Sequence, residues 1–232
     1  MLTLAIDTST NILSIALVQG DEVLTNKDMA TKNNQSEILM SKIAQMMSTC
    51  QLLPADLEKI AVAIGPGSYT GIRVGVTVAK SLAYALNLPL VAVSSLEIMA
   101  SAENNHKDVI VPMMDARRQT VFAGAYQAGE NIISDGHYTI GALIDELKEK
   151  CQPSDKIVFI GDGANACEEL LLTTFQQVCV KNEQALTNSK SISLARLAKT
   201  YPVEEDIHQL VPKYLRQTEA EMNLNERNRQ TT

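Results

Sequence analysis

The chain repeats one pattern twice: an apolar strand that ends in aspartate, a polar turn, and a second apolar strand. The first copy begins with Leu2–Asp7 (LTLAID), followed by TSTN and an apolar run over residues 12–20. The second begins with Val109–Asp115 (VIVPMMD), followed by ARRQ and a run over residues 121–130, so the two aspartates lie 108 positions apart. Because a duplicated unit must bury its apolar faces in the same way each time, the repeat strongly narrows the possible folds and predicts two similar halves.

Helical patterns alternate with the expected strands, which is typical of an α/β protein. The polar stretch AENNHK at residues 102–107 is the expected boundary. We therefore expect an N-terminal lobe at residues 1–101, a C-terminal lobe at residues 108–217 and a flexible tail at residues 218–232. Further strands are expected at residues 21–30, 57–64, 90–95, 131–138 and 156–164, and helices at residues 36–50, 72–86, 94–102, 139–150, 166–178 and 191–201.

The segment GPGSYTG at residues 65–71 joins an expected strand to the second helix. A glycine-rich turn at a helix N-terminus can hold a phosphate with its backbone amides, or it can orient the helix. The segment is not the GxxxxGK[ST] phosphate-binding motif, because Ile72 and Arg73 stand where that motif needs Lys and Ser or Thr. The residues alone leave both interpretations open, and the family resemblance given below favours the second, in which the turn orients the helix.

The first two helices carry apolar side chains at helical spacing. On the first helix they are Ile38, Leu39, Ile43, Met46 and Met47. On the second helix, a row of small residues comprises Gly71, Gly75, Ala79 and Ala83, and an adjacent apolar row comprises Val74, Val78 and Leu82. A methionine-bearing stripe suits either the core or an adaptable contact surface. A row of small residues permits another helix or a sheet to approach closely.

Composition excludes several function classes. The formal net charge is −7, so long-range electrostatics oppose direct binding to nucleic acid, and RNA would be reached through a partner. The four cysteines form no CxxC pair, and the three histidines form neither HExxH nor HxxxH, so no metal site is expected. The N-terminus lacks a basic signal region, and no apolar run reaches the roughly 20 residues of a membrane span. A cytoplasmic, soluble protein is expected.

The strand-end aspartates and the glycine turns suggest a cleft between the lobes. In one interpretation Asp7 and Asp115 hold a metal ion while turn amides hold phosphates; in the other these carboxylates accept from turn amides and the glycines serve positive φ. The cleft candidates are Asp7, Thr8, Gly65, Gly67, Asp115 and Gly161. The pair Arg117–Arg118 either binds an anion or lies in a solvated turn. No GxSxG nucleophile motif is present, and no complete catalytic set is visible.

Several motifs together resemble the TsaB family. They are AIDTST, GPGSYTGIRVG, the following SSLE, DARR and the late VPKYLR with EAE, and they occur in the expected order over nearly the whole chain. The resemblance implies two RNase H-like lobes of the actin/sugar-kinase/Hsp70 superfamily. It also implies a subunit of the machinery that makes N6-threonylcarbamoyladenosine at position 37 of tRNA. In that family the nucleotide cleft is degenerate, so neither a catalytic residue nor a cofactor is expected here.

The resemblance also implies partners. The chemistry belongs to the paralogue TsaD, and a small ATPase, TsaE, joins the pair. TsaB pairs with TsaD through a bundle of the first two helices of each protein, and it forms a homodimer through the same surface when alone. Transferred to this chain, the interface candidates are Ile38, Leu39, Ile43, Met46, Met47, Gly71, Val74, Gly75, Val78, Ala79 and Leu82, with Met46, Met47 and Val74 as expected hot spots.

Three positions depart from the family pattern: Gln35 where many relatives have His, and Gln119 and Phe122 where relatives often have Gly and Tyr. These departures weaken any residual small-molecule site near the turns. The sequence therefore predicts a non-catalytic scaffold subunit. One alternative is an ATP-dependent small-molecule kinase of the same superfamily, using Asp7 and Asp115 with Mg²⁺. A glycoprotein peptidase is a weaker alternative, because no nucleophile or histidine metal motif is present.

Overall fold

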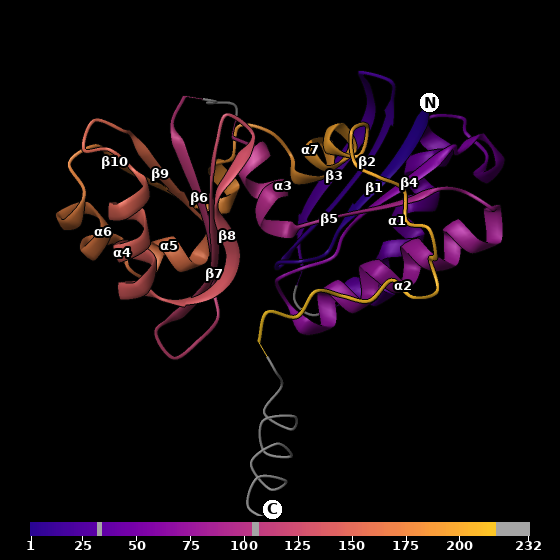
Figure 1. The fold of residues 1–232 in the computed structure, drawn as a ribbon. Helices are drawn as coiled ribbons and strands as arrows, with labels where there is room; N and C mark the ends of the chain where they lie inside the picture. Colours follow the sequence, from indigo (N-terminus) through magenta and orange to yellow (C-terminus); the bar gives the residue numbers. More distant parts are fainter. Residues whose placement is uncertain (32–33, 104–106, 217–232) are drawn as a thin grey trace, which may run out of the picture.

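The computed structural model describes residues 1–31, 34–103 and 107–216, which form two lobes side by side (Figure 1). The first lobe contains a five-stranded sheet in the order β3-β2-β1-β4-β5. Strand β1 pairs antiparallel with β2 and parallel with β4, so it lies at the centre of the sheet with every residue buried. The strands are β1 (Leu2–Asp7), β2 (Ile12–Gln19), β3 (Glu22–Ala30), β4 (Lys59–Ala63) and β5 (Leu90–Val93).

The second lobe repeats this arrangement. Its sheet has the order β8-β7-β6-β9-β10, with β6 antiparallel to β7 and parallel to β9. The strands are β6 (Val109–Asp115), β7 (Thr120–Gln127), β8 (Glu130–Thr139), β9 (Ile157–Ile160) and β10 (Val178–Lys181). The two sheets are thus of one topology, and the predicted α/β fold with two lobes of the actin type is confirmed.

Strand β10 is a correction to the sequence prediction. A helix was expected over residues 166–178, but α6 (Glu168–Thr174) ends at Thr174, and the chain enters β10 after Phe175. The ring of Phe175 lies 5.7 Å from that of Phe159 on β9, centroid to centroid. Because Phe175 packs into the core of the second lobe at this point, the tertiary contact overrides the helical spacing of its neighbours.

The helices of the first lobe are α1 (Gln35–Thr49) and α2 (Tyr69–Leu86), and a short 3-10 turn, η1 (Pro54–Asp56), follows α1. Helix α2 begins where the Ser68 hydroxyl accepts a hydrogen bond from the Gly71 amide, and it ends at Asn87 in the left-handed conformation. These are the expected start and stop signals of a helix. Both helices pack their apolar stripes on the sheet that contains β1.

The second lobe has shorter helices. Helix α4 (Ile140–Lys150) begins at Thr139, whose hydroxyl accepts from the Ala142 amide, and it buries Leu143, Ile144 and Leu147. Helix α5 (Asp162–Asn165) is a single turn that follows β9, and α6 comes next. The core of this lobe forms around the fully buried Phe159.

Two helices cross between the lobes. Helix α3 (Ser95–Ser101) follows β5 but packs on β6 and β7, whereas α7 (Lys190–Leu197), preceded by the 3-10 turn η2 (Glu183–Ala185), packs on β1 and β2 (Figure 1). Leu96 and Met99 of α3 join a core with Ile110, and Leu194 of α7 joins a core with Val91. Each sheet is therefore covered on one face by a helix from the other half of the sequence.

The C-terminal segment, residues 198–216, also returns to the first lobe. After α7 the Glu204 amide donates to the Leu90 carbonyl, and the Lys213 amide donates to the Ile64 carbonyl. The backbone thus returns to the first lobe between residues 190 and 213, within the C-terminal lobe expected at residues 108–217, and Arg216 then contacts the Ala116 carbonyl of the second lobe. The predicted tail at residues 218–232 lies outside the described residues. Among the described helices, none is long and apolar enough to cross a membrane.

Candidate functional site

The structure divides the predicted interface residues on α1 and α2 into two groups. The first group is buried in the core of the lobe, and the second is partly exposed on its outer side. Buried are Leu39, Ile43, Met46, Met47, Gly71, Gly75 and Ala79. Partly exposed are Ile38, Val74, Val78 and Leu82.

Met46 and Met47 were expected to be partner contacts, but their side chains are only 4% and 5% exposed. They occupy positions of α1 that face the sheet, where the same helical stripe that suggested an interface fills the core. Of the expected hot spots, Val74 alone stays accessible in the single chain.

The row of small residues on α2 also faces its own lobe. A Cβ atom added to Gly71 would lie 2.1 Å from the Thr8 carbonyl oxygen, and one added to Gly75 would lie 2.3 Å from the Thr8 hydroxyl. That hydroxyl donates to the Gly71 carbonyl across 2.7 Å. The close approach permitted by the glycines is therefore used between α2 and the end of β1.

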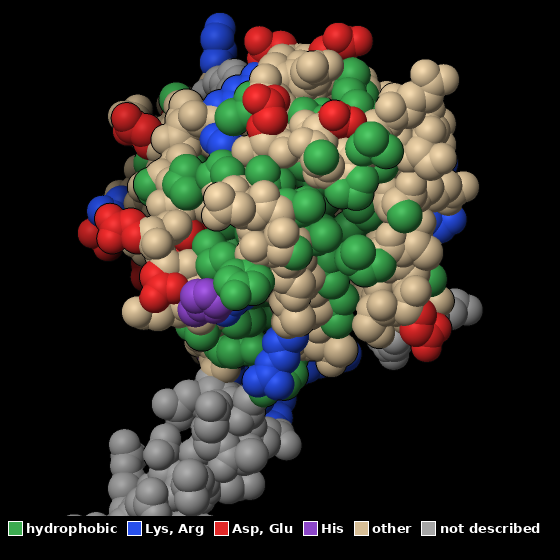
Figure 2. All heavy atoms as spheres, turned by 90° about the vertical axis from the view of Figure 1, so that its right-hand side faces the viewer, with side chains coloured by type: hydrophobic (Ala, Val, Ile, Leu, Met, Phe, Trp, Pro, Cys, Tyr) green, Lys and Arg blue, Asp and Glu red, His purple; other side chains and the backbone are tan. Residues whose placement is uncertain are grey.

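The outer side of α2 is poor in charge after its first turn, whereas α1 carries Glu37 and Lys42 beside its uncharged residues. Figure 2 shows hydrophobic side chains over much of this face of the molecule, with acidic and basic side chains toward its edges. Between Val74 and Ala85, the single charged residue of α2 is Lys80, whose ammonium group donates to the carbonyls of His208 and Leu210. We call the accessible, uncharged set the α1–α2 surface: Ile38, Met40 and Ala44 of α1 and Val74, Thr77, Val78, Ser81, Leu82 and Ala85 of α2.

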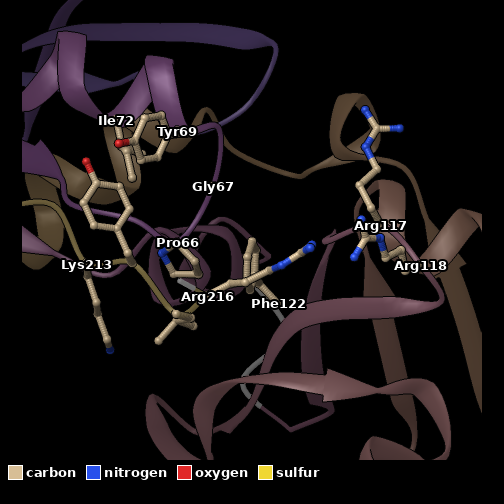
Figure 3. A pocket seen from close by; sticks show the side chains of 11 residues that line it. Pro66, Gly67, Tyr69, Ile72, Arg117, Arg118, Phe122, Lys213 and Arg216 are labelled. Carbon is tan, nitrogen blue, oxygen red and sulfur yellow. The ribbon is translucent and has the colours of Figure 1, made fainter. Parts of the chain in front are cut away.

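A second feature is a cavity of about 400 Å³ beside the glycine turn, which we call the basic-aromatic pocket (Figure 3). It lies where the first lobe, the turn after β6 and the C-terminal segment meet. Its aromatic and basic lining residues are Tyr69, Arg117, Arg118, Phe122, Lys213, Tyr214 and Arg216. Sequence reasoning found the Arg117–Arg118 pair but missed the tyrosines and Arg216, because nothing local links residue 216 to the turn after β6.

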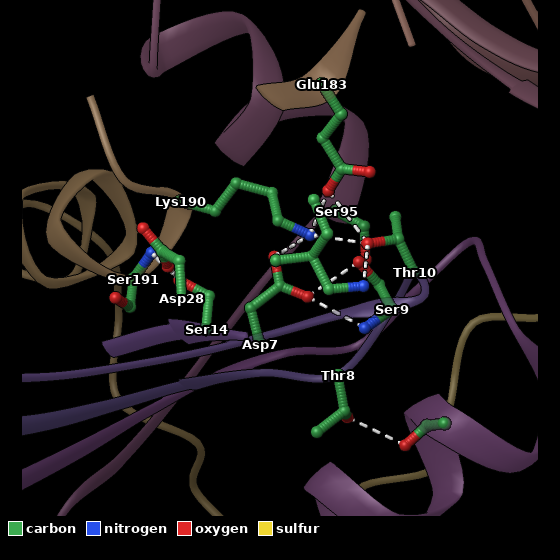
Figure 4. A network of polar contacts seen from close by, with 12 residues as sticks. Asp7, Thr8, Ser9, Thr10, Ser14, Asp28, Ser95, Glu183, Lys190 and Ser191 are labelled. Atoms are coloured by element: carbon green, nitrogen blue, oxygen red, sulfur yellow. Dashed lines mark hydrogen bonds and ion pairs between the residues drawn. The ribbon is translucent and has the colours of Figure 1, made fainter. Parts of the chain in front are cut away.

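A buried ion cluster occupies the end of β1 (Figure 4). The Lys190 ammonium nitrogen lies 3.4 Å from a carboxylate oxygen of Asp7 and 2.6 Å from one of Glu183. The side chains of Asp7 and Lys190 are 0% and 2% exposed. Burial alone lowers the pKa of Lys190, but the charges of Asp7 and Glu183 outweigh it and raise that pKa, so the ammonium form persists.

The two strand-end aspartates make the same turn contact. The Ser9 amide donates to Asp7 Oδ1 and the Arg117 amide donates to Asp115 Oδ1, each across 2.8 Å. These contacts favour the interpretation in which the carboxylates satisfy turn amides. Asp115 differs in being 37% exposed at its side chain, with the Arg117 guanidinium 3.9 Å from its other oxygen.

A cleft of about 490 Å³ lies between the two turns. Of the six predicted cleft residues, Gly67 and Asp115 line it, together with Asp162, Thr10 and Gln35. Asp7 and Thr8 are completely buried, and Gly65 and Gly161 are packed beneath the turns, where a Cβ atom would meet backbone oxygens. The predicted constellation is therefore not assembled as one open site.

The backbone of the GPGSYTG turn is largely engaged inside the protein. The Gly65 amide donates to the Ser95 hydroxyl, and the Ser68 amide donates to the Ser9 carbonyl. A Cβ atom on Gly67 would lie 2.2 Å from the Ser9 carbonyl oxygen, so only glycine allows the turn to sit against this backbone. These contacts favour a turn that orients α2 over one that holds a phosphate. No group of three His, Cys, Asp or Glu within the described part of the chain could hold a metal ion.

Comparisons with known proteins agree with this arrangement. Residues 23–224 match the family described as "TsaD: tRNA N6-adenosine threonylcarbamoyltransferase". The chain is 38% identical over 225 residues to the tRNA threonylcarbamoyladenosine biosynthesis protein TsaB of Bacillus subtilis, covering 95% of this chain and 96% of that protein. It is 32% identical over 174 residues to TsaB of Escherichia coli, covering 73% and 75%.

A solved structure gives the same fold. It is an uncharacterized protein of Pseudomonas aeruginosa with similarity to the peptidase YeaZ, and it superposes with a TM-score of 0.76 at 24% identity. The superposition covers 93% of this chain and 99% of that one, so both lobes are shared. With the sequence identity to the two TsaB proteins extending over most of their length, the chain belongs to the TsaB family.

Proposed function

We propose that this chain is a non-catalytic subunit of the machinery that makes N6-threonylcarbamoyladenosine in tRNA. In this proposal it pairs with a TsaD-like catalytic subunit, and a TsaE-like ATPase joins the pair. The names of its relatives support a role in this modification, and the match to the TsaD family supports a partner of similar fold. The transfer of the threonylcarbamoyl group would then take place on the partner.

The observation that most supports this proposal is the contrast between the buried ion cluster and the α1–α2 surface. The Asp7 carboxylate, which would hold a metal-bound nucleotide in an ATP-dependent kinase, is paired with the buried Lys190 ammonium. An ammonium group at this position competes with Mg²⁺ for the same oxygens, so the kinase alternative has little support. By contrast, an uncharged helix surface can be buried against another protein at low desolvation cost.

The α1–α2 surface is also the proposed homodimer interface. Because TsaB-like and TsaD-like chains share sequence similarity, two copies of this surface can pack as one copy packs on a paralogue. A subunit activates its partner only through contacts that differ between the partner's active and inactive states. The proposed role is therefore to stabilise the active arrangement of the TsaD-like subunit by burying the α1–α2 surface.

An omission assay tests the function. It combines TsaD-like and TsaE-like proteins, the enzyme that forms threonylcarbamoyl-adenylate, ATP, threonine, bicarbonate and unmodified tRNA, with and without this chain. Modified adenosine that forms only when the chain is present supports the proposal. Equal modification without it refutes the proposal.

The interface is tested with the double variant Thr77→Glu and Ser81→Glu, whose positions are exposed in the single chain. Two new charges buried without partners should weaken capture of the TsaD-like subunit at least a hundredfold, at about 1.4 kcal/mol per tenfold change. Gln176→Glu with Gln177→Glu is the matched control, because it adds the same charge to exposed sites of the second lobe. Capture unchanged by the first pair would refute this interface.

A further inference from the structure

The basic-aromatic pocket concentrates positive charge in an acidic protein. Four of its lining residues are Arg117, Arg118, Lys213 and Arg216, and the lining contributed by the described residues includes no Asp or Glu. Arg73 adds a fifth positive charge beside the tyrosines. Four of the 20 lysines and arginines of the chain thus line one cavity and a fifth lies beside it, which is a local reversal of the net charge of −7.

The charges of Arg117 and Lys213 are only loosely compensated. The Arg117 guanidinium is 3.9 Å from the nearest Asp115 oxygen, beyond hydrogen-bond distance, and its side chain is 85% exposed. The Lys213 ammonium is 3.7 Å from Asp135. Arg216 donates one hydrogen bond from Nη1 to the Ala116 carbonyl across 2.8 Å, which fixes it against the turn that carries the other two arginines. A guanidinium has five N–H donors, so Arg216 retains donors for an anion.

The other side of the pocket is an aromatic platform. The rings of Tyr69 and Tyr214 lie 5.1 Å apart at 34°, and they are 44% and 40% exposed. The Arg73 guanidinium lies 4.0 Å above the Tyr69 ring, and its Nε donates to the Tyr214 hydroxyl across 2.6 Å. In Figure 3 the Tyr69 side lies across the opening from Arg117 and Arg118. Planar rings opposite guanidinium groups are the combination that binds bases and phosphates together.

The turn that presents the arginines is held in an unfavourable conformation. Arg117, Arg118 and Gln119 have φ values of 68°, 53° and 59°, which is the left-handed region. The turn is closed by Thr120, whose amide and hydroxyl both donate to the Arg117 carbonyl. Successive non-glycine residues in this region persist only where the surrounding structure imposes them, and such segments concentrate at functional sites.

We propose that the basic-aromatic pocket binds single-stranded RNA, with one base against the Tyr69–Tyr214 platform and the flanking phosphates at Arg117, Arg118 and Arg216. RNA fits because the lining cations come from residues 117–118 and residues 213–216, and Arg73 adds another beside the tyrosines, so that positive charge extends along the opening as a chain of several phosphates requires. The net charge does not prevent this contact, since charges more than about 8 Å away are screened at physiological ionic strength. The choice of RNA rests on the proposed function, in which tRNA is the substrate.

The test uses the full chain and a fluorescein-labelled single-stranded RNA of about 12 nucleotides, with binding followed by fluorescence anisotropy. The double variant Arg117→Gln with Arg118→Gln should weaken binding on the order of tenfold at low salt. It should also reduce the slope of log K against log[salt] by about 0.7 for each phosphate that the variant no longer neutralises. Its control is Lys148→Gln with Lys150→Gln, which removes the same charge from exposed sites of α4. This control should leave both quantities unchanged.

The platform is tested separately. Tyr214→Leu should weaken binding on the order of tenfold without changing the salt slope, because stacking does not release counterions. Tyr214→Phe keeps the ring and should retain the affinity. Equal binding by all variants would overturn the inference.

Competition experiments distinguish the sources of the ligand. AMP or ATP that displaces the RNA at equal concentration would overturn the RNA assignment in favour of a free nucleotide. The same variants are also tested for capture of the TsaD-like subunit. Reduced RNA binding with normal capture supports the inference. The proposed function is tested independently by the omission assay, so the two can fail separately.

Discussion

The two lobes have one topology but differ in what is attached to it. Both place a central strand that ends in aspartate beside a turn amide, with the same distance from the Ser9 amide to Asp7 and from the Arg117 amide to Asp115. The helix that follows the fourth strand, however, has 18 residues in the first lobe and 4 in the second. The first lobe thus presents a helix surface, whereas the second presents an exposed turn with two arginines.

This difference shows which part of the duplicated unit is fixed by folding. The strand order and the aspartate turn are the same in both lobes. The groups around the turn are free to diverge: Asp7 is buried against Lys190, and Asp115 is partly exposed beside Arg117. We infer that the proposed functions of this chain reside in the parts where the lobes differ.

The largest expected effect on stability concerns the partners of the two strand-end aspartates. Lys190→Met leaves Asp7 and Glu183 buried without their cation and should lower the free energy of unfolding by about 3–5 kcal/mol. Arg117→Met, at the corresponding aspartate of the second lobe, should change it by no more than about 0.5 kcal/mol. Urea denaturation measures both. Similar losses in the two variants would show that the lobes do not differ in this way.

The helical glycines should give effects of opposite sign. Gly71→Ala in α2 places a Cβ atom against the Thr8 carbonyl and should cost about 1–3 kcal/mol of stability. Gly141→Ala in α4 meets no atom within 4 Å, so it should stabilise the chain by about 0.4–1 kcal/mol through the unfolded state. Thermal unfolding of the two variants decides the point, and a stabilised Gly71→Ala would contradict the close packing of α2.

The smallest expected effect concerns the helices that cross between the lobes. Glu97 of α3 accepts a hydrogen bond from Tyr201, which follows α7, so the pair joins the two crossing segments. Burial raises the pKa of Glu97 above its usual 4.5, assisted by the charge of Asp135, while the Tyr201 hydrogen bond and Lys213 act in the opposite direction. Because the folded-state pKa is raised, the protonated carboxyl stabilises the fold below pH 4.5, and this contribution is lost as pH rises through the folded-state value.

The substitution Glu97→Gln replaces the carboxyl with a neutral amide, so the variant should not lose this stabilisation as pH rises. The variant should unfold about 2 °C higher than the parent at pH 7 and at the same temperature as the parent at pH 4. Thermal melts at the two pH values provide the measurement and its internal control. A lower melting temperature at pH 7 would show that the ionised Glu97 stabilises the crossing helices.

Most of the fold could be predicted because burial of apolar side chains follows a short period. The alternation and apolar runs of Leu2–Asp7 and Val109–Asp115 gave the central strands, and the stripes of α1 and α2 gave those helices. The prediction was wrong at β10, where four residues are too short to distinguish a strand from the end of a helix.

The candidate site was less predictable. Periodicity shows that Met46 and Gly75 lie on an apolar or small-residue face, but it does not show what covers that face. In the folded chain the cover is the lobe's own sheet, so the accessible residues are the neighbouring Val74, Val78 and Leu82. The family resemblance identified α1 and α2 as the interface helices, and the tertiary structure showed which of their side chains are accessible.

The sequence by itself determined the repeated α/β framework, the aspartate at each strand end and the capped helix α2, since each depends on residues close together in the chain. Only the tertiary structure decided that Lys190 pairs with Asp7, that α3 and α7 exchange lobes, and that Tyr214 and Arg216 meet the turn at Arg117. These contacts join residues from distant parts of the chain. They form because α3 and α7 each bury apolar surface on the sheet of the other lobe, and because the segment after α7 returns to the first lobe. No local sequence pattern encodes either arrangement.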